Sequence, residues 1–546
     1  METKTVDRRE FIKSLLAGVS VVALDWNSFP ISTGAARDDK GFDAVIIGSG
    51  LGGLSCAAAF ARQGFKPLVL EKHDRPGGYA TTFSRPGGFV FDVSLHSTTV
   101  GDREGIHNLI YGFPEITDVE FVPHRNLYRI IYPDYDLRVP QKDVAGYVKL
   151  LARLFPDEQR GIQGLLDDMK GLSDDISRYS NARGKIDMNR FPQDFPFLFN
   201  NFSKTWGTMV NARIKDPKLQ SIVSSLWGYY GLPPSMLSSF YYALPTYGYL
   251  RQGGYYPKGR SQKISDAFVK FIEDRGGKVV LNSRVTEILT KDHAAYGVKT
   301  ADGKEYAGRV VVSNSNAFDT FHSMPGENDV LKEYVGKFDR YSVSLSSFQV
   351  FLGLKEDLVG KIGIEDSEIF YHTSYDHEAG YEAALTANMD NTGYGLTLYD
   401  NIYKGYSPEG KNTLSLLVLQ GYDHWKEFEE DYFKGNKTAY RAEKERMADI
   451  LIKKAEETLL PGLSSAIEVK EIATPLTNLR YTGNTRGAIY GWDQTLGNSG
   501  QNRVPHTTPI KNLYLSGAWT RPGHGYGGVI GSGLECFGEI MGNWKS

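Results

Sequence analysis

One short segment near the start of the chain constrains the fold more than any other. An apolar run at Ala44–Ile47 is typical of a buried parallel strand, and an alanine-rich stretch at Leu54–Gln63 suits a tightly packed helix. A second apolar run follows at Pro67–Leu70. Strand, helix and strand in this order form a βαβ unit, which requires a parallel sheet covered by a helix. The sequence therefore predicts an α/β fold.

The turn of this unit carries glycines at the spacing of a dinucleotide-binding site. Gly48, Gly50 and Gly53 form a GxGxxG pattern, and Glu71 ends the second strand. Gly48 permits the tight turn, Gly50 lets the backbone approach a pyrophosphate, and Gly53 lets helix and strand touch. The helix N-terminus then supplies N–H groups to the phosphates, and the carboxylate of Glu71 accepts hydrogen bonds from a ribose. We expect dinucleotide binding here.

Two further glycine-rich stretches favour FAD over a nicotinamide dinucleotide. A second pair, Gly77 and Gly78, lies in DRPGGYATTF just after the acid-bearing strand, as in the extended signature of amine oxidase and carotenoid desaturase flavoproteins. Near the C-terminus, an apolar strand runs into Gly517, a Pro-Gly-rich loop follows, and we predict a helix starting near Gly531. A second helix N-terminus could face the flavin there.

The chain resembles the carotenoid desaturase, carotenoid isomerase and retinol saturase group of flavoproteins. The resemblance rests on four blocks: 231–288 (GLPPSM…NSRVTEI), 300–314 (TADGKEYAGRVVVSN), 483–494 (GNTRGAIYGWDQ) and 508–533 (TPIKNLYLSGAWTRPGHGYGGVIGSG). It implies a discontinuous Rossmann-like FAD-binding domain with a mixed α+β substrate domain inserted between its parts. The predicted FAD-binding segments are 41–100, 253–330 and 495–546, and the substrate segments are 101–252 and 331–494.

The same resemblance assigns roles to particular residues. Val285 would hold the adenine through its backbone. The loop 517–528 would lie along the flavin, and its cofactor-binding residues would be Gly517, Ala518, Gly525 and Gly528. Many flavoproteins have Asp at the position of Ala518, so a hydrogen bond to the ribityl chain would come from the backbone instead.

Two departures from the group's pattern suggest residues of the active site. The group usually has paired glycines where this chain has Gly259 and Arg260, so Arg260 could anchor a substrate carboxylate, or it could be a solvated surface arginine. His96 could contact the flavin or donate a proton, or it could be a structural histidine. His524 and Tyr526 of the flavin-facing loop could line the cavity or only fill the turn.

The expected chemistry is hydride transfer at flavin N5 to or from a hydrophobic unsaturated isoprenoid, polyene or lipid. No metal-ligand spacing and no His/Asp/Ser constellation is visible, which suits polyene chemistry. Aromatic stretches at 194–206, 224–236 and 238–249 could form a long apolar cavity or a monotopic membrane surface, or they could be ordinary core. The sequence does not decide among oxidation, reduction and isomerisation.

The N-terminus has the features of an export signal. Arg8 and Arg9 precede an apolar run, Leu15–Leu24, that is shorter than the roughly 20 residues of a membrane-spanning helix. The arrangement resembles a twin-arginine signal, a route known for folded proteins, and we assign 1–36 to signal and tail. We therefore expect a periplasmic location. With only one visible βαβ unit, we expect the electron partner to be a quinone, a periplasmic carrier or oxygen rather than a nicotinamide.

Composition excludes some other classes of function. The net charge of −3 gives no reason to expect a nucleic-acid partner. The two cysteines, Cys56 and Cys536, are too few for a metal cluster, and we expect free core thiols, although one bridge remains open. Two alternative functions also remain open: a flavin amine or amino-acid oxidase, with Tyr490 and Trp492 as part of an aromatic cage, and a non-catalytic flavoprotein or lipid carrier.

Overall fold

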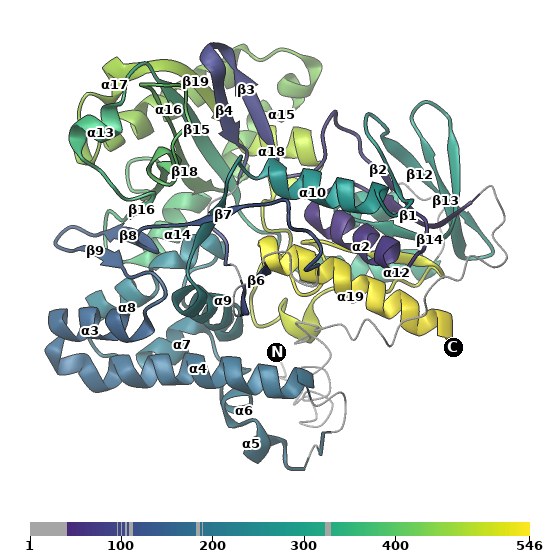
Figure 1. Cartoon of the computed structure of the whole chain (residues 1–546), viewed down its shortest axis with the longest axis horizontal. Helices are drawn as coiled ribbons and strands as arrows, with labels where there is room; N and C mark the ends of the chain where they lie inside the picture. The colour runs from purple at the N-terminus through teal and green to yellow at the C-terminus, as the bar shows by residue number, and fades with distance from the viewer. Residues whose placement is uncertain are drawn as a thin grey trace.

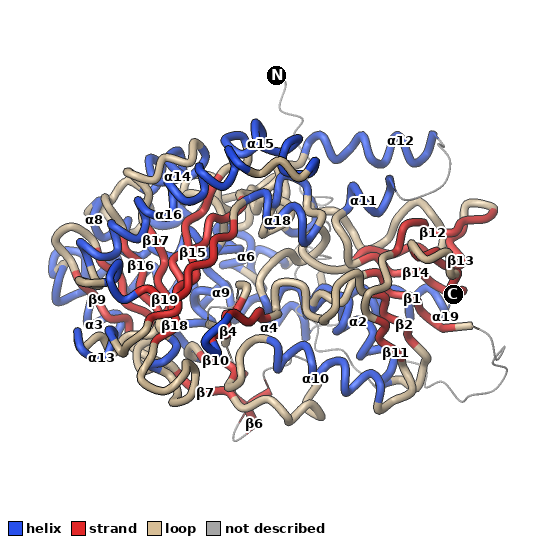
Figure 2. Tube along the Cα trace, turned by 90° about the horizontal axis from the view of Figure 1, so that it is seen from above, coloured by secondary structure: helices blue, strands red, loops and turns tan. Residues whose placement is uncertain are grey.

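The computed structural model describes residues 41–94, 97–99, 101–103, 106–108, 113–181, 186–187, 189–322 and 329–545. Two β-sheets lie at opposite ends of the long axis, with loops and helices between them (Figures 1 and 2). A group of helices packs beside the second sheet. The predicted export signal lies outside the described residues.

The first sheet is built from three separate parts of the chain. It has the strand order β11-β2-β1-β14-β13-β12, and β20 also pairs with β14. Strands β11, β2, β1, β14 and β20 run parallel, as expected for a sheet whose apolar strands are buried on both faces. The strands are β1 (Phe42–Ile47), β2 (Pro67–Leu70), β11 (Lys278–Val280), β12 (Val285–Lys291), β13 (Ala294–Thr300), β14 (Glu305–Ser313) and β20 (Leu513–Leu515).

Helices from both ends of the chain pack together on this sheet. Helix α2 (Leu51–Arg62) packs against α19 (Tyr526–Lys545) and α10 (Gln262–Glu273) (Figure 1). The helices approach closely because Gly533 of α19 faces the backbone of α2, where a Cβ would be 2.7 Å from the nitrogen of Cys56. Cys56 and Cys536 are both buried free thiols in this interface, and the first and last segments of the chain therefore share one core.

The second sheet is mixed and lies under several helices. Its strand order is β19-β15-β18-β17-β16-β8-β9, and only β16 and β8 run parallel. Its strands are β8 (Tyr128–Ile131), β9 (Asp136–Val139), β15 (Ser346–Leu354), β16 (Glu368–Tyr371), β17 (Tyr394–Thr397), β18 (Asn412–Gln420) and β19 (Ile467–Ala473). The helices of this part are α13 (Leu358–Ile362), α14 (His377–Leu385), α15 (Asp423–Lys434), α16 (Thr438–Thr458), α17 (Leu463–Ala466) and α18 (Pro475–Thr482).

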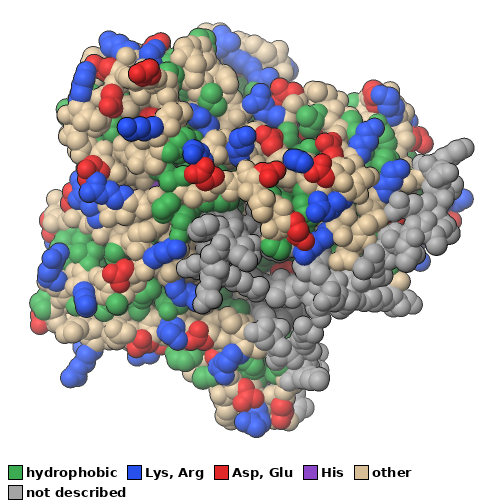
Figure 3. All heavy atoms as spheres, in the orientation of Figure 1, with side chains coloured by type: hydrophobic (Ala, Val, Ile, Leu, Met, Phe, Trp, Pro, Cys, Tyr) green, Lys and Arg blue, Asp and Glu red, His purple; other side chains and the backbone are tan. Residues whose placement is uncertain are grey.

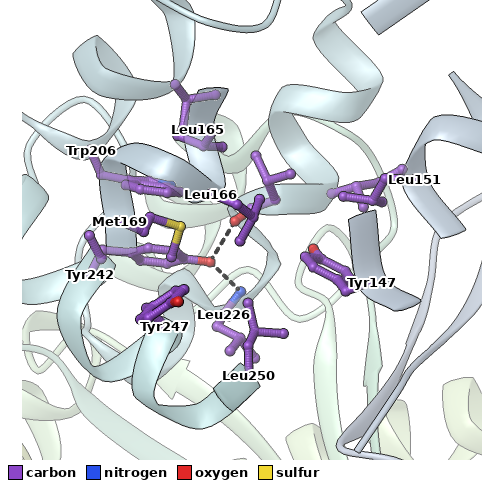
Figure 4. Close-up of a cluster of buried hydrophobic side chains, with 14 of the residues drawn as sticks. Tyr147, Leu151, Leu165, Leu166, Met169, Trp206, Leu226, Tyr242, Tyr247 and Leu250 are labelled. Carbon is purple, nitrogen blue, oxygen red and sulfur yellow. Dashed lines mark hydrogen bonds between the residues drawn. The ribbon is translucent and has the colours of Figure 1, made fainter. Parts of the chain in front are cut away.

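A helical group follows β9 in sequence and has its own core. Its helices are α3 (Val144–Leu154), α4 (Gln159–Asn181), α5 (Phe191–Asp194), α6 (Pro196–Asn201), α7 (Trp206–Asn211), α8 (Pro217–Val223) and α9 (Ser239–Gln252). The Trp206 ring stacks on Tyr242 at 4.2 Å between centroids, and the Tyr242 hydroxyl donates to the carbonyl of Val223 at 2.9 Å (Figure 4). This core holds α9 in place beside α4.

Smaller elements connect the two sheets. The hairpin of β3 (Thr82–Arg85) and β4 (Phe89–Asp92) follows the first βαβ unit, yet Phe91 packs on Phe351 of the second sheet. The hairpin thus joins the two parts of the molecule. The remaining elements are the strands β5 (Gly101–Arg103), β6 (Ile106–Asn108), β7 (Phe121–Pro123) and β10 (Tyr255–Pro257) and the helices α11 (Ala317–His322) and α12 (Asp329–Gly336).

The described surface shows no broad patch of one charge on the face drawn in Figure 3, where acidic and basic side chains are interspersed. Among the described helices, none combines the length and the apolarity that crossing a membrane requires.

Candidate active site

One large cavity extends from the glycine-rich turns to the helical group. Its volume is about 2540 Å³, more than twice the upper end of the roughly 300–1,000 Å³ of ordinary ligand pockets. Residues from β1, β2 and β14 line one part of it, and residues from α4 and α9 line another. The cavity has room for a dinucleotide and for a second, long molecule.

The first glycine signature closes around one asparagine side chain. Asn314 directly follows β14, and its amide lies against Gly50 and Gly52. A Cβ on Gly50 would be 2.7 Å from the Nδ2 atom of Asn314, and one on Gly52 would be 2.7 Å from its Oδ1 atom. Gly53 does not line the cavity, because it lies beneath the turn against the carbonyl of Gly48. Helix α2 begins at this turn without a side-chain cap, so the turn offers backbone N–H groups to an anion.

The ribose-binding acid is held at the cavity wall. Glu71 is buried, and its carboxylate accepts hydrogen bonds from the backbone N–H of Ser49 (2.8 Å) and of His73 (3.0 Å). A carboxylate has about four acceptor sites, so it can accept further bonds from a diol. The N–H of Ser283 donates to the carbonyl of Glu71 at 2.7 Å, and this bond brings Val285 to the same end of the cavity.

The second glycine-rich stretches meet the first ones in space. Gly77 and Gly78 both line the cavity, and the N–H of Gly77 donates to the carbonyl of Ser49. In the C-terminal loop, Gly517 has a left-handed φ of 95° and donates its N–H to Ser532. The lining from this loop consists of Gly517, Ala518, Trp519, Pro522, His524 and Gly525.

Helix α19 presents its first turn to the same cavity. The helix begins at Tyr526, so the predicted start near Gly531 was too late. The difference arises because Tyr526, Gly527 and Gly528 continue the turn directly into the helix, although a glycine-rich sequence is ordinarily unfavourable there. Gly528 therefore faces the cavity from the helix itself.

A buried arginine fixes the C-terminal loop. Arg503 is 1% exposed, and its guanidinium donates to the carbonyls of Ala518 (2.5 Å) and Thr520 (2.8 Å). The same guanidinium donates to the carbonyls of Trp492 and Asp493 at 3.2 and 3.3 Å. Burial lowers the pKa of Arg503 to about 10, which still leaves it charged at neutral pH. This cation therefore ties the loop along the cavity to the segment before it.

These features fit FAD. Two helix N-termini and two glycine turns face one cavity, and a Cβ at Gly50, Gly77 or Gly517 would lie 2.7, 2.3 or 2.4 Å from a neighbouring atom. The turn beside α2 would hold the phosphates and the first turn of α19 would face the flavin, while Glu71 and Val285 would hold the ribose and adenine. A bound FAD supplies hydride transfer at its flavin ring.

Aromatic side chains line the rest of the cavity. Of the three predicted wall segments, 238–249 contributes most, through one face of α9. The segment 224–236 contributes Tyr229 and Tyr230, and the segment 194–206 contributes only Phe202, because its other aromatic residues pack within the helical group. The lining residues from α9 are Phe240, Tyr241, Leu244, Pro245, Gly248 and Tyr249, followed by the polar Arg251 and Gln252 at the end of the helix.

Two rings in contact, tilted by 33° to each other, lie where the aromatic wall meets the C-terminal loop. The ring centroids of Tyr490 and His524 are 4.3 Å apart, and both residues line the cavity. Neither ring nitrogen of His524 has a hydrogen-bond partner within the described residues. Burial and the charge of Arg503 lower the pKa of His524 to about 3, so this imidazole is neutral.

The predicted pairing of Tyr490 with Trp492 in an aromatic cage does not form. Trp492 is fully buried behind the loop, does not line the cavity, and packs on Tyr341 and Trp519. In an extended segment the side chains of Tyr490 and Trp492 would point to the same side. The turn at Gly491 (φ 71°) lies between them and separates the two rings. His524 takes the place beside Tyr490 that the cage interpretation gave to Trp492.

Arg260 is not among the residues that line the cavity, and its role as a substrate anchor stays a prediction. Its guanidinium lies 4.1 Å from the centroid of the Tyr406 ring and donates to the carbonyl of the same residue. Gly259 and Arg260 both have left-handed φ values, 86° and 74°, and this turn before α10 directs the side chain to Tyr406. Burial raises the pKa of the nearby Asp92 carboxyl. The positive charge of Arg260 opposes this rise, because it favours the ionised carboxylate.

His96 lies outside the described residues, and its predicted catalytic role stays a prediction. Within the described part of the chain, no group of three or more His, Cys, Asp or Glu side chains could hold a metal ion.

Three residues of the site escaped sequence reasoning. Asn314 was part of a block used for resemblance, Arg503 is a lone basic residue in a polar loop, and Glu368 begins a strand far from any motif. The polar sequence around Arg503, LGNSGQNRVPHTT, carries no signal that could have identified it. Asn314 owes its position to the end of β14, which only the folded sheet brings to the cavity, and Glu368 lies at the start of β16, outside the lining of this cavity.

The fold and the cavity define an FAD-dependent oxidoreductase. Its sequence matches, over residues 51–540, the family described as flavin containing amine oxidoreductase, and the chain belongs to this family.

Relatives from several kingdoms align with almost the whole chain. It is 27% identical to the all-trans-retinol 13,14-reductase of Danio rerio (93% of this chain, 87% of the relative) and 28% identical to the neurosporene-forming phytoene desaturase of Rhodobacter capsulatus (90% and 92%). It is 26% identical to a chloroplastic prolycopene isomerase of an Oncidium hybrid (92% and 84%). The predicted resemblance to this group is confirmed.

Solved structures share the fold at lower sequence identity. An oxidoreductase from Methanosarcina mazei aligns with a TM-score of 0.59 at 17% identity, covering 91% of this chain and 99% of the other. A putrescine oxidase bound to putrescine aligns with a TM-score of 0.59 at 14% identity, covering 92% and 99%. The predicted fold class is thereby confirmed.

Proposed function

We propose that this oxidoreductase acts on the conjugated double bonds of an isoprenoid polyene. The observation that carries the proposal is the single cavity that joins the glycine turns to the aromatic face of α9. A long apolar molecule can lie along α9 with one end beside the flavin position, as hydride transfer requires. The relatives named for retinol, lycopene and phytoene support this substrate class.

The test compares polyenes with amines on the purified holoenzyme. All-trans-retinol, prolycopene and phytoene are each incubated with the oxidised and with the reduced enzyme, and products are identified by absorbance and mass spectrometry. We expect one polyene to change, and the redox state that works identifies the direction of the reaction. Flavin reduction by an amine with peroxide release, and no change in any polyene, would contradict the proposal. If the enzyme transforms no polyene and oxidises no amine, a function as a carrier is favoured.

We also propose that the protein is exported in its folded state and exchanges electrons with a quinone or a periplasmic carrier, in loose contact with a membrane. The support is the Arg8-Arg9 pair and the apolar run after it, together with a cofactor that is made in the cytoplasm. Replacing both arginines by lysine keeps the charge and should abolish export, as followed by cell fractionation. Wild-type export of the double variant would contradict the proposal.

A further inference from the structure

A buried carboxylic acid outside every recognised motif lies behind the aromatic wall. Glu368, at the start of β16, is 2% exposed. Its carboxylate accepts hydrogen bonds from the hydroxyls of Tyr229 (3.1 Å), Tyr249 (3.4 Å) and Tyr399 (3.1 Å). Four elements of the fold supply these four residues, so the cluster is a product of tertiary structure rather than of a local motif.

Two of the three tyrosines line the large cavity. Tyr229 and Tyr249 contribute to its wall, whereas Tyr399 does not. A substrate lying along α9 would thus meet phenolic hydroxyls that are already hydrogen-bonded to a carboxyl group. Phenol and carboxyl together can give or take one proton without moving either side chain.

A second, smaller cavity lies on the other side of Glu368. Its volume is about 110 Å³, enough for a few water molecules at about 30 Å³ each. Glu368 and Tyr229 line its inner part, and the exposed residues Thr373, Ser374 and Asn391 line its outer part. This cavity gives solvent protons access to the carboxyl group.

We propose that Glu368 relays protons between solvent and the large cavity, and that Tyr229 and Tyr249 exchange those protons with the substrate. The inference deepens the proposed function and rests on it. In the reducing direction, a bound reduced flavin would supply the hydride for a C–H bond at one end of the conjugated system, and the π electron pair displaced from that bond would move to the other end. There the O–H bond of a tyrosine breaks and a second C–H bond forms. The phenolate takes the proton of Glu368, and the carboxylate takes one from water in the small cavity. Desaturation is the reverse sequence with oxidised flavin.

The protonation states around Glu368 suit this relay. Burial raises the pKa of Glu368 to about 7, although the three phenol donors oppose the rise. Burial lowers the pKa of His124 to about 3 and of His377 to about 4, and it places that of His372 well below its usual value, so these neighbours are neutral.

The other ionisable groups near Glu368 are occupied elsewhere. Asp366, on the segment that leads into β16, pairs with Arg129 and Arg138. Asp92, which contacts Tyr256 next to Tyr399, accepts hydrogen bonds from the backbone and hydroxyl of Ser261. Glu368 is therefore the carboxyl of this cluster that gains and loses a proton near neutral pH.

The test measures single-turnover rates of the holoenzyme with all-trans-retinol and with prolycopene between pH 5 and 9, in water and in heavy water. We expect Glu368→Gln to slow the step on the order of 10²-fold and to remove the change in rate near pH 7. Glu368→Asp should restore that pH dependence in part. The variant Tyr229→Phe/Tyr249→Phe, which leaves Glu368 in place, should show a similar loss. Tyr242→Phe removes a buried, hydrogen-bonded hydroxyl outside both cavities and should keep the wild-type profile.

A second measurement does not depend on turnover. The infrared difference spectrum between pH 6 and pH 8 should contain a protonated-carboxyl band that Glu368→Gln lacks, whereas the contribution of Asp493, whose pKa burial raises to about 6, should remain in the variant. Wild-type rate and pH profile in both variants, or an infrared band unchanged in Glu368→Gln, would overturn the relay. A holoenzyme that shows the band but transforms none of all-trans-retinol, prolycopene and phytoene would contradict the proposed function while supporting the proton site.

Discussion

The ring centroids of Tyr490 and His524 are 4.3 Å apart and the ring planes are tilted by 33°, at the point where the aromatic wall meets the C-terminal loop. This relationship places a neutral imidazole, rather than the indole of Trp492, beside the tyrosine. The site therefore differs from a cage for a cationic amine, which requires aromatic faces on more than one side of the substrate nitrogen.

Replacing His524 by phenylalanine should keep an aromatic ring beside Tyr490 and remove an acid-sensitive group. The pKa of His524 is lowered from 6.5 to about 3, so the unfolded chain binds a proton between these values and the folded chain does not. The contribution of His524 to the free energy of unfolding is complete above pH 6.5. It decreases by about 1.4 kcal/mol per pH unit as the pH drops toward 3. His524→Phe should show a weaker loss between pH 6.5 and 4 in urea unfolding. An acid sensitivity equal to that of the wild type would show that the histidine is not buried as a neutral group.

Replacing Gly50 by valine should abolish FAD binding without unfolding the protein. A Cβ there would be 2.7 Å from the Nδ2 atom of Asn314 and would block the approach of the backbone to a pyrophosphate. Gly542→Val in α19, where a Cβ meets nothing within 4 Å, is the matched control. The measurement is the flavin-to-protein ratio after purification, with circular dichroism as the check of folding. Full flavin content in folded Gly50→Val would refute the assignment of the turn.

Replacing Arg503 by methionine should loosen the loop beside the flavin. The side chain donates to the carbonyls of Ala518 and Thr520, and removing it leaves buried carbonyls without donors. We expect a loss on the order of 3 kcal/mol in the free energy of unfolding, together with weaker FAD binding. Urea unfolding of the apoprotein and FAD titration measure the two effects separately. Unchanged FAD affinity would show that the loop keeps its shape without the arginine.

Replacing Glu368 by glutamine should stabilise the protein at alkaline pH. The folded pKa of about 7 lies above the ordinary value of 4.5, so the folded carboxyl holds its proton more tightly than the unfolded one. This group's contribution is therefore most favourable below pH 4.5 and is lost as the pH rises to 7, by on the order of 3 kcal/mol. The difference in unfolding free energy between Glu368→Gln and the wild type should grow from pH 5 to pH 8. A constant difference would mean that the carboxyl is ionised throughout.

Replacing Arg260 by glycine should leave substrate preference unchanged, because Arg260 does not line the cavity. Loss of the contact with Tyr406 costs about 0.5–1 kcal/mol, and relief of the left-handed φ offsets it by a similar amount. The rates of flavin reduction with a carboxylated polyene and with its alcohol should keep the wild-type ratio. If the acid-to-alcohol rate ratio is lower in the variant than in the wild type, Arg260 contributes to binding of the substrate carboxylate.

The parts of the fold that sequence could predict are those with a strong local pattern. The apolar runs at Ala44–Ile47 and Pro67–Leu70 predict β1 and β2, and the alanine-rich stretch at Leu54–Gln63 predicts α2, each within about three residues of the observed bounds. The glycine motifs required their neighbours to be strand and helix, and the structure has both.

What sequence could not predict depends on distant contacts. The sequence around Glu368 does not predict that three tyrosines from other elements donate hydrogen bonds to it, or that burial raises its pKa. Arg260 resembled a ligand because a family glycine was missing, whereas the backbone turn decides where its side chain lies. Side-chain direction after a left-handed turn is a property of tertiary structure.

The packing of α2 against α19 sets the order in which the molecule can mature. A ribosome makes β1 and α2 well before β20 and α19. The part of the predicted FAD site formed by β1 and α2 therefore stays incomplete until β20 and α19 have been synthesised. The cofactor can be captured only after the last helix has emerged. A prematurely terminated chain lacks the second helix N-terminus and the strand that pairs with β14. Retention of the yellow cofactor is therefore a readout of chain completion.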